Sequence, residues 1–140
     1  MAGREEIVAT LAQFSLFADL KAPQLEAIVG QLDEAFFAEG TKILRQGLTG
    51  SGLYFVLEGT CGVEVDGEER ARIGRGEFFG EISVLLGSPP TADVIALSDA
   101  RCRVLAAPGA ETFLAAYPSL MYRMLQVQAR RLRAANTFNN

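Results

Sequence analysis

Histidine and tryptophan are absent from this sequence, and cysteine occurs only at Cys61 and Cys102. Without histidine the chain lacks the commonest general base, so no Ser-His or Cys-His pair can exist. Neither cysteine belongs to a CxxC pair, and a zinc site is therefore not expected. Carboxylate-only chemistry stays open, but nothing else in the sequence points to it and there is no nucleophile elbow. We expect a protein that is not an enzyme and has no metal or cofactor.

A long apolar run is also missing, since no window approaches the ~18 apolar residues that a membrane span requires. The first residues place Arg4, Glu5 and Glu6 ahead of a short mixed segment, which is unlike a secretory signal. The net charge is −4, and a general nucleic-acid binder needs a basic face instead. The same charge argues weakly against an anionic membrane as partner. We expect a cytoplasmic protein with no nucleic-acid or membrane partner.

The 140 residues, about half of them apolar, are enough for one domain with one core. Apolar residues at helical spacing predict two short helices within residues 1–34, with a break before Pro23. Helical spacing returns over 108–136, where Pro108 and Pro118 each favour a helix start. Between these zones, residues 35–106 contain glycines at turn spacing around short β-prone runs: Gly40, Gly47, Gly50, Gly52, Gly59, Gly62, Gly67, Gly74 and Gly76. The order predicts a mainly β domain with flanking helices.

Alternation of period two marks individual strands in the middle zone. Val63 and Val65 point one way in VEVD, which ends in Asp66-Gly67, a strong hairpin signal. In RCRVL, Cys102 and Val104 are expected to face inward and the two arginines to face solvent. Both cysteines are therefore interpreted as small apolar fillers without a disulfide.

The last helical zone has an apolar band wider than one contact surface needs. No acidic residue follows Glu111, whereas four arginines do: Arg123, Arg130, Arg131 and Arg133. Cations near a helix C-terminus complement its dipole, and this is one interpretation. The other is a docking or homodimer helix whose basic end meets an acidic surface on a second copy or a partner protein.

Four blocks of sequence follow one another in a recognisable order. They are FSLFADLKAPQLEAIV, then EGTKILRQG with SGLYFVLEGTCGV, then FFGEISVLL with PPTADV, and last AAYPSLMYRMLQVQARRLRAAN. This order resembles the cyclic-nucleotide-binding domain family, which includes catabolite-activator-type regulators, regulatory subunits of cAMP-dependent protein kinase and nucleotide-gated channels. The resemblance implies a double-stranded β-helix, a jelly-roll-like β-roll, over 35–106 between the two helical zones, in a single domain of residues 1–140.

The family's phosphate-binding cassette corresponds to residues 78–94. The physics of this stretch agrees, because a helical turn after Gly80 leaves its first amides free to face an anion. The resemblance implies that Glu81 holds a ribose hydroxyl, and that Ser83, Thr91 and the amide of Ala92 meet the phosphate. The expected ligand-binding residues are Phe79, Gly80, Glu81, Ile82, Ser83, Pro90, Thr91 and Ala92. The expected ligand is cAMP or cGMP.

Each role has a plainer alternative. Glu81 can simply complement the helix dipole, Ser83 can be a solvated helix residue, and Thr91 can be a strand former. Phe78 and Phe79 suit the core better than a base-stacking platform. An apolar slot for the base is open to Val63, Val65 and Ile73, although the core of the roll explains these residues equally well.

One position departs from the family pattern. Pro90 stands where the family has the arginine that grips the cyclic phosphate, and no Lys or Arg occurs between Arg75 and Arg101. Proline supplies neither charge nor an amide donor, so affinity for a cyclic nucleotide is expected to be weakened. Arg72 or Arg75 from the preceding strand is a substitute to consider. Three hypotheses remain: a weak cyclic-nucleotide sensor, a non-nucleotide or ligand-free module of the same fold, and a dimerisation or interaction domain.

Overall fold

The computed structural model describes residues 3–48 and 52–139, with side chains up to residue 136. Two short helices open the chain, as predicted, and a 3₁₀ turn fills the break between them. Pro23 lies in the first turn of the second helix, where the amide of Lys21 donates to Gln24 Oε1 over 3.0 Å. The elements are α1 (Arg4–Ala12), η1 (Ser15–Phe17) and α2 (Ala22–Gln31).

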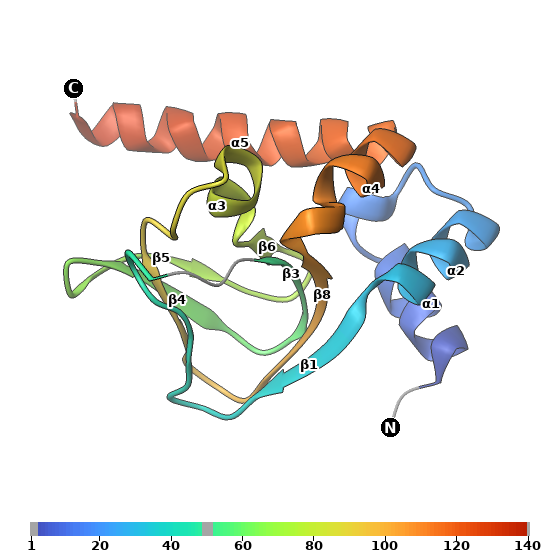
Figure 1. Cartoon of the computed structure of the whole chain (residues 1–140), viewed down its shortest axis with the longest axis horizontal. Helices are drawn as coiled ribbons and strands as arrows, with labels where there is room; N and C mark the ends of the chain where they lie inside the picture. Colours follow the sequence, from blue (N-terminus) through green and yellow to red (C-terminus); the bar gives the residue numbers. More distant parts are fainter. Residues whose placement is uncertain (1–2, 49–51, 140) are drawn as a thin grey trace.

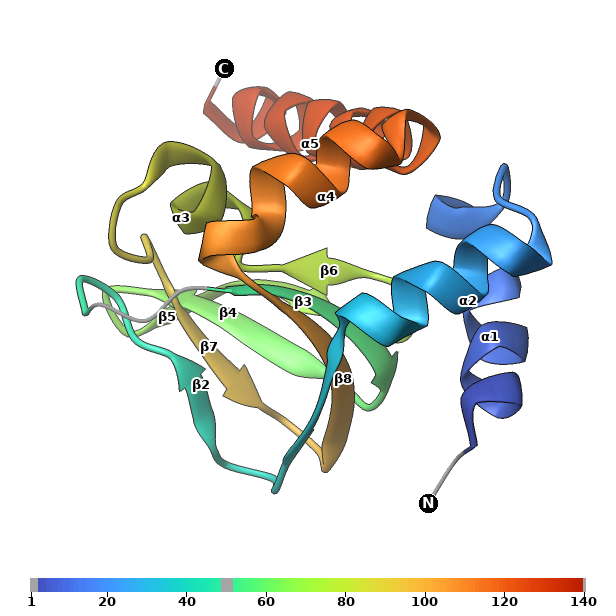
Figure 2. The ribbon, with the colours of Figure 1, turned by 45° about the vertical axis from the view of Figure 1, so that its right-hand side comes forward.

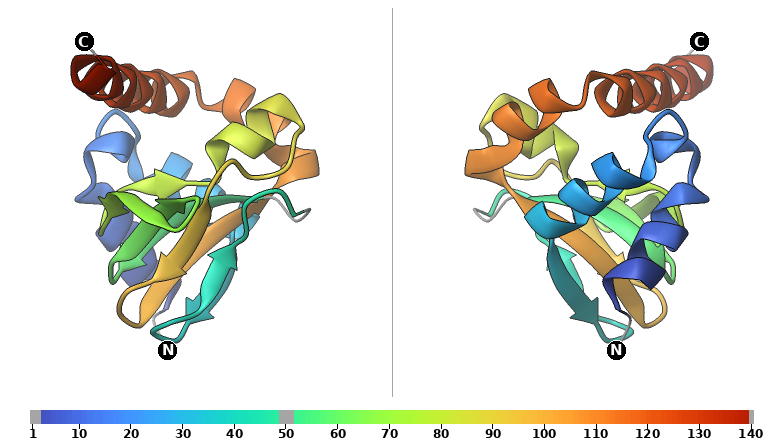
Figure 3. Two further views of the ribbon diagram at one scale, coloured as in Figure 1. Left: turned by 90° about the vertical axis from the view of Figure 1, so that its left-hand side faces the viewer. Right: turned by 90° about the vertical axis from the view of Figure 1, so that its right-hand side faces the viewer.

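Within the described ranges, eight strands form the predicted roll from two antiparallel four-stranded sheets, in the orders β1-β8-β3-β6 and β2-β7-β4-β5. Figures 2 and 3 show the two sheets curling toward each other beside the helices. The roll begins two residues before the predicted position 35. The strands are β1 (Asp33–Phe37), β2 (Lys42–Leu44), β3 (Gly52–Glu58), β4 (Cys61–Val65), β5 (Glu68–Ile73), β6 (Phe78–Phe79), β7 (Asp93–Ala96) and β8 (Ala100–Ala106).

Gly40, Gly47, Gly59, Gly67, Gly74 and Gly76 lie in the connections between strands, as predicted, whereas Gly52 and Gly62 lie within β3 and β4, so the expectation of turns at these two was wrong. The β4–β5 hairpin turns at Asp66 and Gly67, whose φ values of 54° and 83° are those of a type I′ turn. The predicted turn at Gly50 lies outside the described residues.

The sheet containing β3 and β8 has a buried side chain layer on each face. Leu53, Phe55 and Leu57 pack against the N- and C-terminal helices, whereas Val56 and Cys102 pack inside the roll. One β-strand thus serves two cores, because successive side chains point to opposite faces.

Both cysteines are free and buried inside the roll, which confirms their interpretation as apolar fillers. Burial raises the pKa of the Cys102 thiol to about 12, so this thiol stays protonated. The expectation for Arg103 was wrong. Its side chain turns under the helices, is only partly exposed, and donates from Nη1 to the carbonyl oxygen of Leu32 at 3.3 Å.

The chain ends in a helical layer across the top of the roll in Figure 1. Its elements are η2 (Ala107–Gly109), α4 (Ala110–Ala116) and α5 (Pro118–Asn139), and α5 continues three residues beyond the predicted end at 136. One side of α5 is buried in the helical core, where Leu120 and Met124 pack. On the same helix, Arg123 forms two hydrogen bonds with Asp19 at 2.8 and 3.1 Å, which join α5 to the loop after η1.

Candidate functional site

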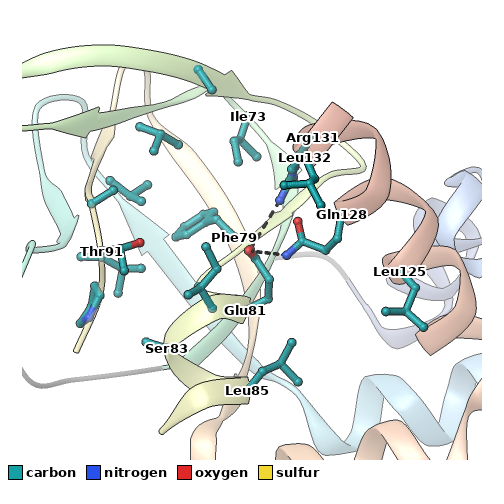
Figure 4. Close-up of a pocket in the computed structure, with 18 residues that line it drawn as sticks. Ile73, Phe79, Glu81, Ser83, Leu85, Thr91, Leu125, Gln128, Arg131 and Leu132 are labelled. Atoms are coloured by element: carbon teal, nitrogen blue, oxygen red, sulfur yellow. Dashed lines mark hydrogen bonds and ion pairs between the residues drawn. The ribbon is translucent and has the colours of Figure 1, made fainter. Parts of the chain in front are cut away.

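A cavity of about 620 Å³ lies between the roll, the short helix α3 (Glu81–Leu86) and α5. Its lining is mostly apolar. Figure 4 shows that polar side chains reach it from three directions, namely α3, the loop before β7 and α5. The structure brings all eight residues predicted from the sequence to this cavity: Phe79, Gly80, Glu81, Ile82, Ser83, Pro90, Thr91 and Ala92.

Gly80 creates the sharp turn that aims α3 at the cavity. Its φ is +87°, in the left-handed region, and a Cβ at this position would collide with the backbone oxygen of Gly52 in β3. Only glycine satisfies both conditions. The need for glycine here is therefore explained by the close approach of the backbone of β3.

The carboxylate of Glu81 is buried at the start of α3 and faces α5 (Figure 4). Gln128 Nε2 donates to Glu81 Oε2 over 2.8 Å, and Arg131 Nη1 lies 3.5 Å from Glu81 Oε1. Arg131 is also held by Phe78, because its Nη2 donates to the carbonyl oxygen at 3.0 Å and its guanidinium lies 4.7 Å from the ring centroid. In the part of the chain that the structure describes, both partners of this buried carboxylate thus come from the last helix.

Ser83 carries a hydroxyl that has no hydrogen-bond partner among the described residues. The side chain is 3% exposed and lines the cavity, so its interpretation as a solvated helix residue was wrong. Buried hydroxyls are normally satisfied, and the residue that carries this unpartnered one belongs to the cavity wall. Its neighbour Ile82 is 42% exposed at the edge of the cavity.

The loop before β7 forms the opposite side of the cavity. Pro90 is buried, and its carbonyl oxygen accepts a hydrogen bond from the amide of Gly47 at 2.9 Å. Thr91 is exposed and Ala92 half-buried. Thr91 precedes β7 and is not part of a strand, so its interpretation as a strand former was wrong. This wall therefore has a hydroxyl and backbone groups but no charge.

The two arginines considered as substitutes do not line the cavity. Arg72 pairs with Glu69 at 2.9 Å, and Arg75 donates to Gln13 and stacks on Phe14. Arg131 is instead the lining cation within the described part of the chain. Arg131 is one of the four arginines after Glu111. For these the sequence allowed two interpretations, complementing the helix dipole or docking on an acidic surface.

The apolar wall includes two of the three residues proposed for a base slot, Val63 and Ile73, but not Val65. Phe79 lies beside them and stacks on Tyr54 with ring centroids 4.7 Å apart. It is therefore both a core residue, 2% exposed, and a wall of the cavity. A flat apolar group fits against this wall, while hydroxyl and carboxylate groups of α3 lie at its edge.

The described residues contain no group of three or more histidine, cysteine, aspartate or glutamate residues placed to hold a metal ion. No helix in the described ranges is long and apolar enough to cross a membrane.

Comparison with known proteins places these features in one family pattern. A family model described as cyclic nucleotide-binding domain matches residues 34–117, a range that contains most of the roll, the whole cassette and α4. It ends just before α5.

Two relatives and one solved structure show how much of the chain is shared. A candidate potassium channel protein of Rhodopseudomonas palustris is 32% identical over 120 residues, 84% of this chain and 29% of that protein. The cAMP-dependent protein kinase regulatory subunit of Debaryomyces hansenii is 31% identical over 98 residues, 70% of this chain and 22% of that protein. The chain thus spans less than a third of either relative.

The crystal structure of the catabolite activator protein of Thermus thermophilus superposes with a TM-score of 0.76 at 28% identity. The match covers 87% of this chain and 60% of the other. The β-roll with helices at both ends is therefore a shared architecture.

Proposed function

The chain belongs to the cyclic nucleotide-binding domain family, and on that premise we propose that it is a regulatory sensor of cAMP or cGMP with weakened affinity. The observation that carries the proposal is the convergence of all eight predicted ligand-binding residues on one cavity. Two of them, both buried on α3, are Glu81 with its carboxylate and Ser83 with its unpartnered hydroxyl.

A cyclic nucleotide can be matched to these groups by its chemistry. The ribose 2′-hydroxyl donates to the carboxylate of Glu81. An oxygen of the cyclic phosphate accepts from the hydroxyls of Ser83 and Thr91, and the base lies against Val63 and Ile73. These contacts distribute the polar part of the ligand over α3 and the loop before β7.

Weak binding follows from Pro90. A hydrogen bond to a charged group contributes roughly 1.5–3 kcal/mol, and ~1.4 kcal/mol is a factor of ten in affinity. Losing the arginine therefore costs roughly tenfold to hundredfold. Desolvating a phosphate without its partner raises the loss to roughly 2–5 kcal/mol. Arg131 does not compensate directly, because Glu81 and Phe78 already hold its guanidinium.

Regulation requires that the ligand bind two arrangements of the protein with different affinity. In this chain α5 supplies part of the cavity wall through Leu125, Gln128, Arg131 and Leu132. A ligand in the cavity therefore acts on the position of the last helix, and we propose that this helix transmits the signal.

Isothermal titration of the protein with cAMP and with cGMP tests the proposal. Saturable binding in the high-micromolar to millimolar range is expected. Heats of dilution alone at millimolar nucleotide eliminate the sensor of cyclic nucleotides.

A second candidate is the same fold binding an uncharged or weakly acidic small molecule, or no ligand. The charges that line the cavity favour this candidate. Among the described residues they are one carboxylate, Glu81, and one guanidinium, Arg131, and these two already form an ion pair with each other. Micromolar affinity of the unaltered protein for cAMP contradicts this candidate.

A homodimer or partner contact through α5 is compatible with either ligand. Met121, Leu125 and Leu132 are 37%, 59% and 63% exposed and follow one side of the helix at spacings of four and seven, the pattern of a helix–helix seam. Light scattering over a range of concentrations tests self-association, with Leu125→Glu as the disrupting variant. A monomer at the highest concentration contradicts the homodimer.

A further inference from the structure

Both oxygens of the Glu81 carboxylate are engaged by α5. Gln128 Nε2 donates to Oε2 at 2.8 Å, and Arg131 Nη1 faces Oε1 at 3.5 Å. The contacts join residues 47 and 50 positions apart in the chain and lie at the edge of the cavity (Figure 4). A carboxylate can accept about four hydrogen bonds, but Glu81 is only 6% exposed with these partners in place, so a ligand hydroxyl has little open approach to either oxygen.

We propose that Gln128 is an intramolecular competitor of the ligand, and that its side chain must leave Glu81 before a ligand hydroxyl can bind there. The proposal rests on the proposed function for the identity of the ligand. We call the hydrogen bond between Gln128 and Glu81 the Glu81 latch. When this bond is formed it holds this part of α5 on α3, and ligand binding breaks it.

The contacts of the two α5 residues decide which of them yields. Arg131 has two further anchors on Phe78, the carbonyl oxygen and the ring, and its distance to Glu81 is the longer one. Gln128 has no other side-chain hydrogen bond within the described residues. Its amide is only partly buried, so water can satisfy it after displacement. Arg131 stays in place and keeps a positive charge beside the carboxylate.

The latch makes a specific difference between ligands. A ligand that donates a hydroxyl to Glu81 must break a short hydrogen bond to a charged group, whereas a ligand without that hydroxyl leaves the bond intact. Such a bond corresponds to about a tenfold change in affinity. By linkage, the free energy by which the latch lowers the affinity for a hydroxyl-bearing ligand equals the free energy by which that ligand weakens the contact between Gln128 and Glu81.

Titration of wild type and Gln128→Ala with cAMP and with 2′-deoxy-cAMP tests the competition. We expect Gln128→Ala to bind cAMP about tenfold more tightly and 2′-deoxy-cAMP with unchanged affinity. Gln126→Ala is the matched control, since Gln126 is the same residue type on the same helix outside the cavity lining. Its affinities should equal those of wild type.

Two titration results overturn the latch. Weaker cAMP binding by Gln128→Ala means that Gln128 is a ligand contact. An equal gain for both nucleotides means that the substitution only loosens the cavity.

Hydrogen exchange without added nucleotide separates failure of the latch from failure of the proposed function. The amides around residue 128 should exchange faster in Gln128→Ala than in Gln126→Ala, although both variants gain the same helix-forming alanine. If Gln128→Ala exchanges faster but neither wild type nor any variant binds nucleotide, the latch is retained and the cyclic-nucleotide sensor is rejected. Unchanged exchange without nucleotide binding rejects both. Nucleotide binding that Gln128→Ala does not improve rejects the latch alone.

Discussion

The carbonyl oxygen of Pro90 accepts a hydrogen bond from the amide of Gly47, and this bond of 2.9 Å fixes the loop before β7 against the loop after β2. The bond uses only main-chain atoms. Any residue at position 90 retains it, and the side chain at this position lines the cavity. Position 90 can therefore change its chemistry without losing its anchor.

Pro90→Arg should increase the affinity for cAMP roughly tenfold to hundredfold, because a guanidinium adds charged hydrogen bonds to the phosphate. Titration calorimetry measures the change. Pro89→Arg is the matched control, since Pro89 is exposed and does not line the cavity, and it should bind like wild type. A folded Pro90→Arg variant without any gain shows that the cavity no longer suits cyclic nucleotides.

Ser83→Ala should separate stability from binding. Removing a buried hydroxyl that lacks a partner among the described residues should raise the free energy of unfolding by about 1 kcal/mol, while cAMP affinity falls about tenfold. Urea denaturation and calorimetry measure the two quantities. Ser88→Ala, outside the cavity lining, should leave the affinity unchanged. A loss of stability in Ser83→Ala contradicts the assignment of an unpartnered hydroxyl.

Gly80→Ala should destabilise the fold by more than about 2 kcal/mol, because left-handed geometry costs an alanine roughly 1–2 kcal/mol and the new Cβ also meets the Gly52 backbone oxygen. Gly87→Ala is the control. Gly87 has a φ of +66° but open space around its Cβ position, so only the conformational cost applies. Chemical denaturation should give Gly80→Ala a much lower free energy of unfolding than Gly87→Ala. Equal losses of stability would refute the steric argument.

The ion pair between Asp19 and Arg123 should make stability depend on acid pH. The hydrogen bond from Arg123 holds the pKa of Asp19 below its ordinary 3.8. A lowered pKa in the folded state means that the pair stabilises the protein above pH ~4, and that this contribution disappears as the pH falls through the folded pKa. The pair is exposed, so the effect is small.

Arg123→Gln should raise the pKa of Asp19 toward 3.8 and remove that part of the pH dependence. NMR titration of the carboxyl carbon follows the pKa directly. Arg130→Gln, an exposed arginine of the same helix, should leave Asp19 unchanged. A pKa that does not move in Arg123→Gln rules out the pair as its cause.

The fold could be predicted because its signals are local. Asp66-Gly67 is itself a turn signal, and Pro118 marks a helix start. The cassette residues could be predicted from the resemblance, because its motifs FFGEISVLL and PPTADV are contiguous stretches of sequence. The structure brings both stretches to the cavity.

The contribution of α5 could not be predicted from the sequence. Helical spacing tells which residues share a side of a helix, but not which surface that side meets. Arg131 therefore looked like any other member of a basic C-terminal group. Its actual contacts depend on where tertiary packing places α5, which is anchored in the helical core through Leu120 and Met124. Gln128 had no sequence signal at all.

The order of the chain also sets an order of assembly on the ribosome. A chain emerges N-terminus first and begins to fold as it does so, and every strand of the roll precedes α4 and α5. The sheets can therefore begin to form before Gln128 and Arg131 have emerged. Until they arrive, the carboxylate of Glu81 faces water and one wall of the cavity is missing, so a nascent chain has a roll but no enclosed site.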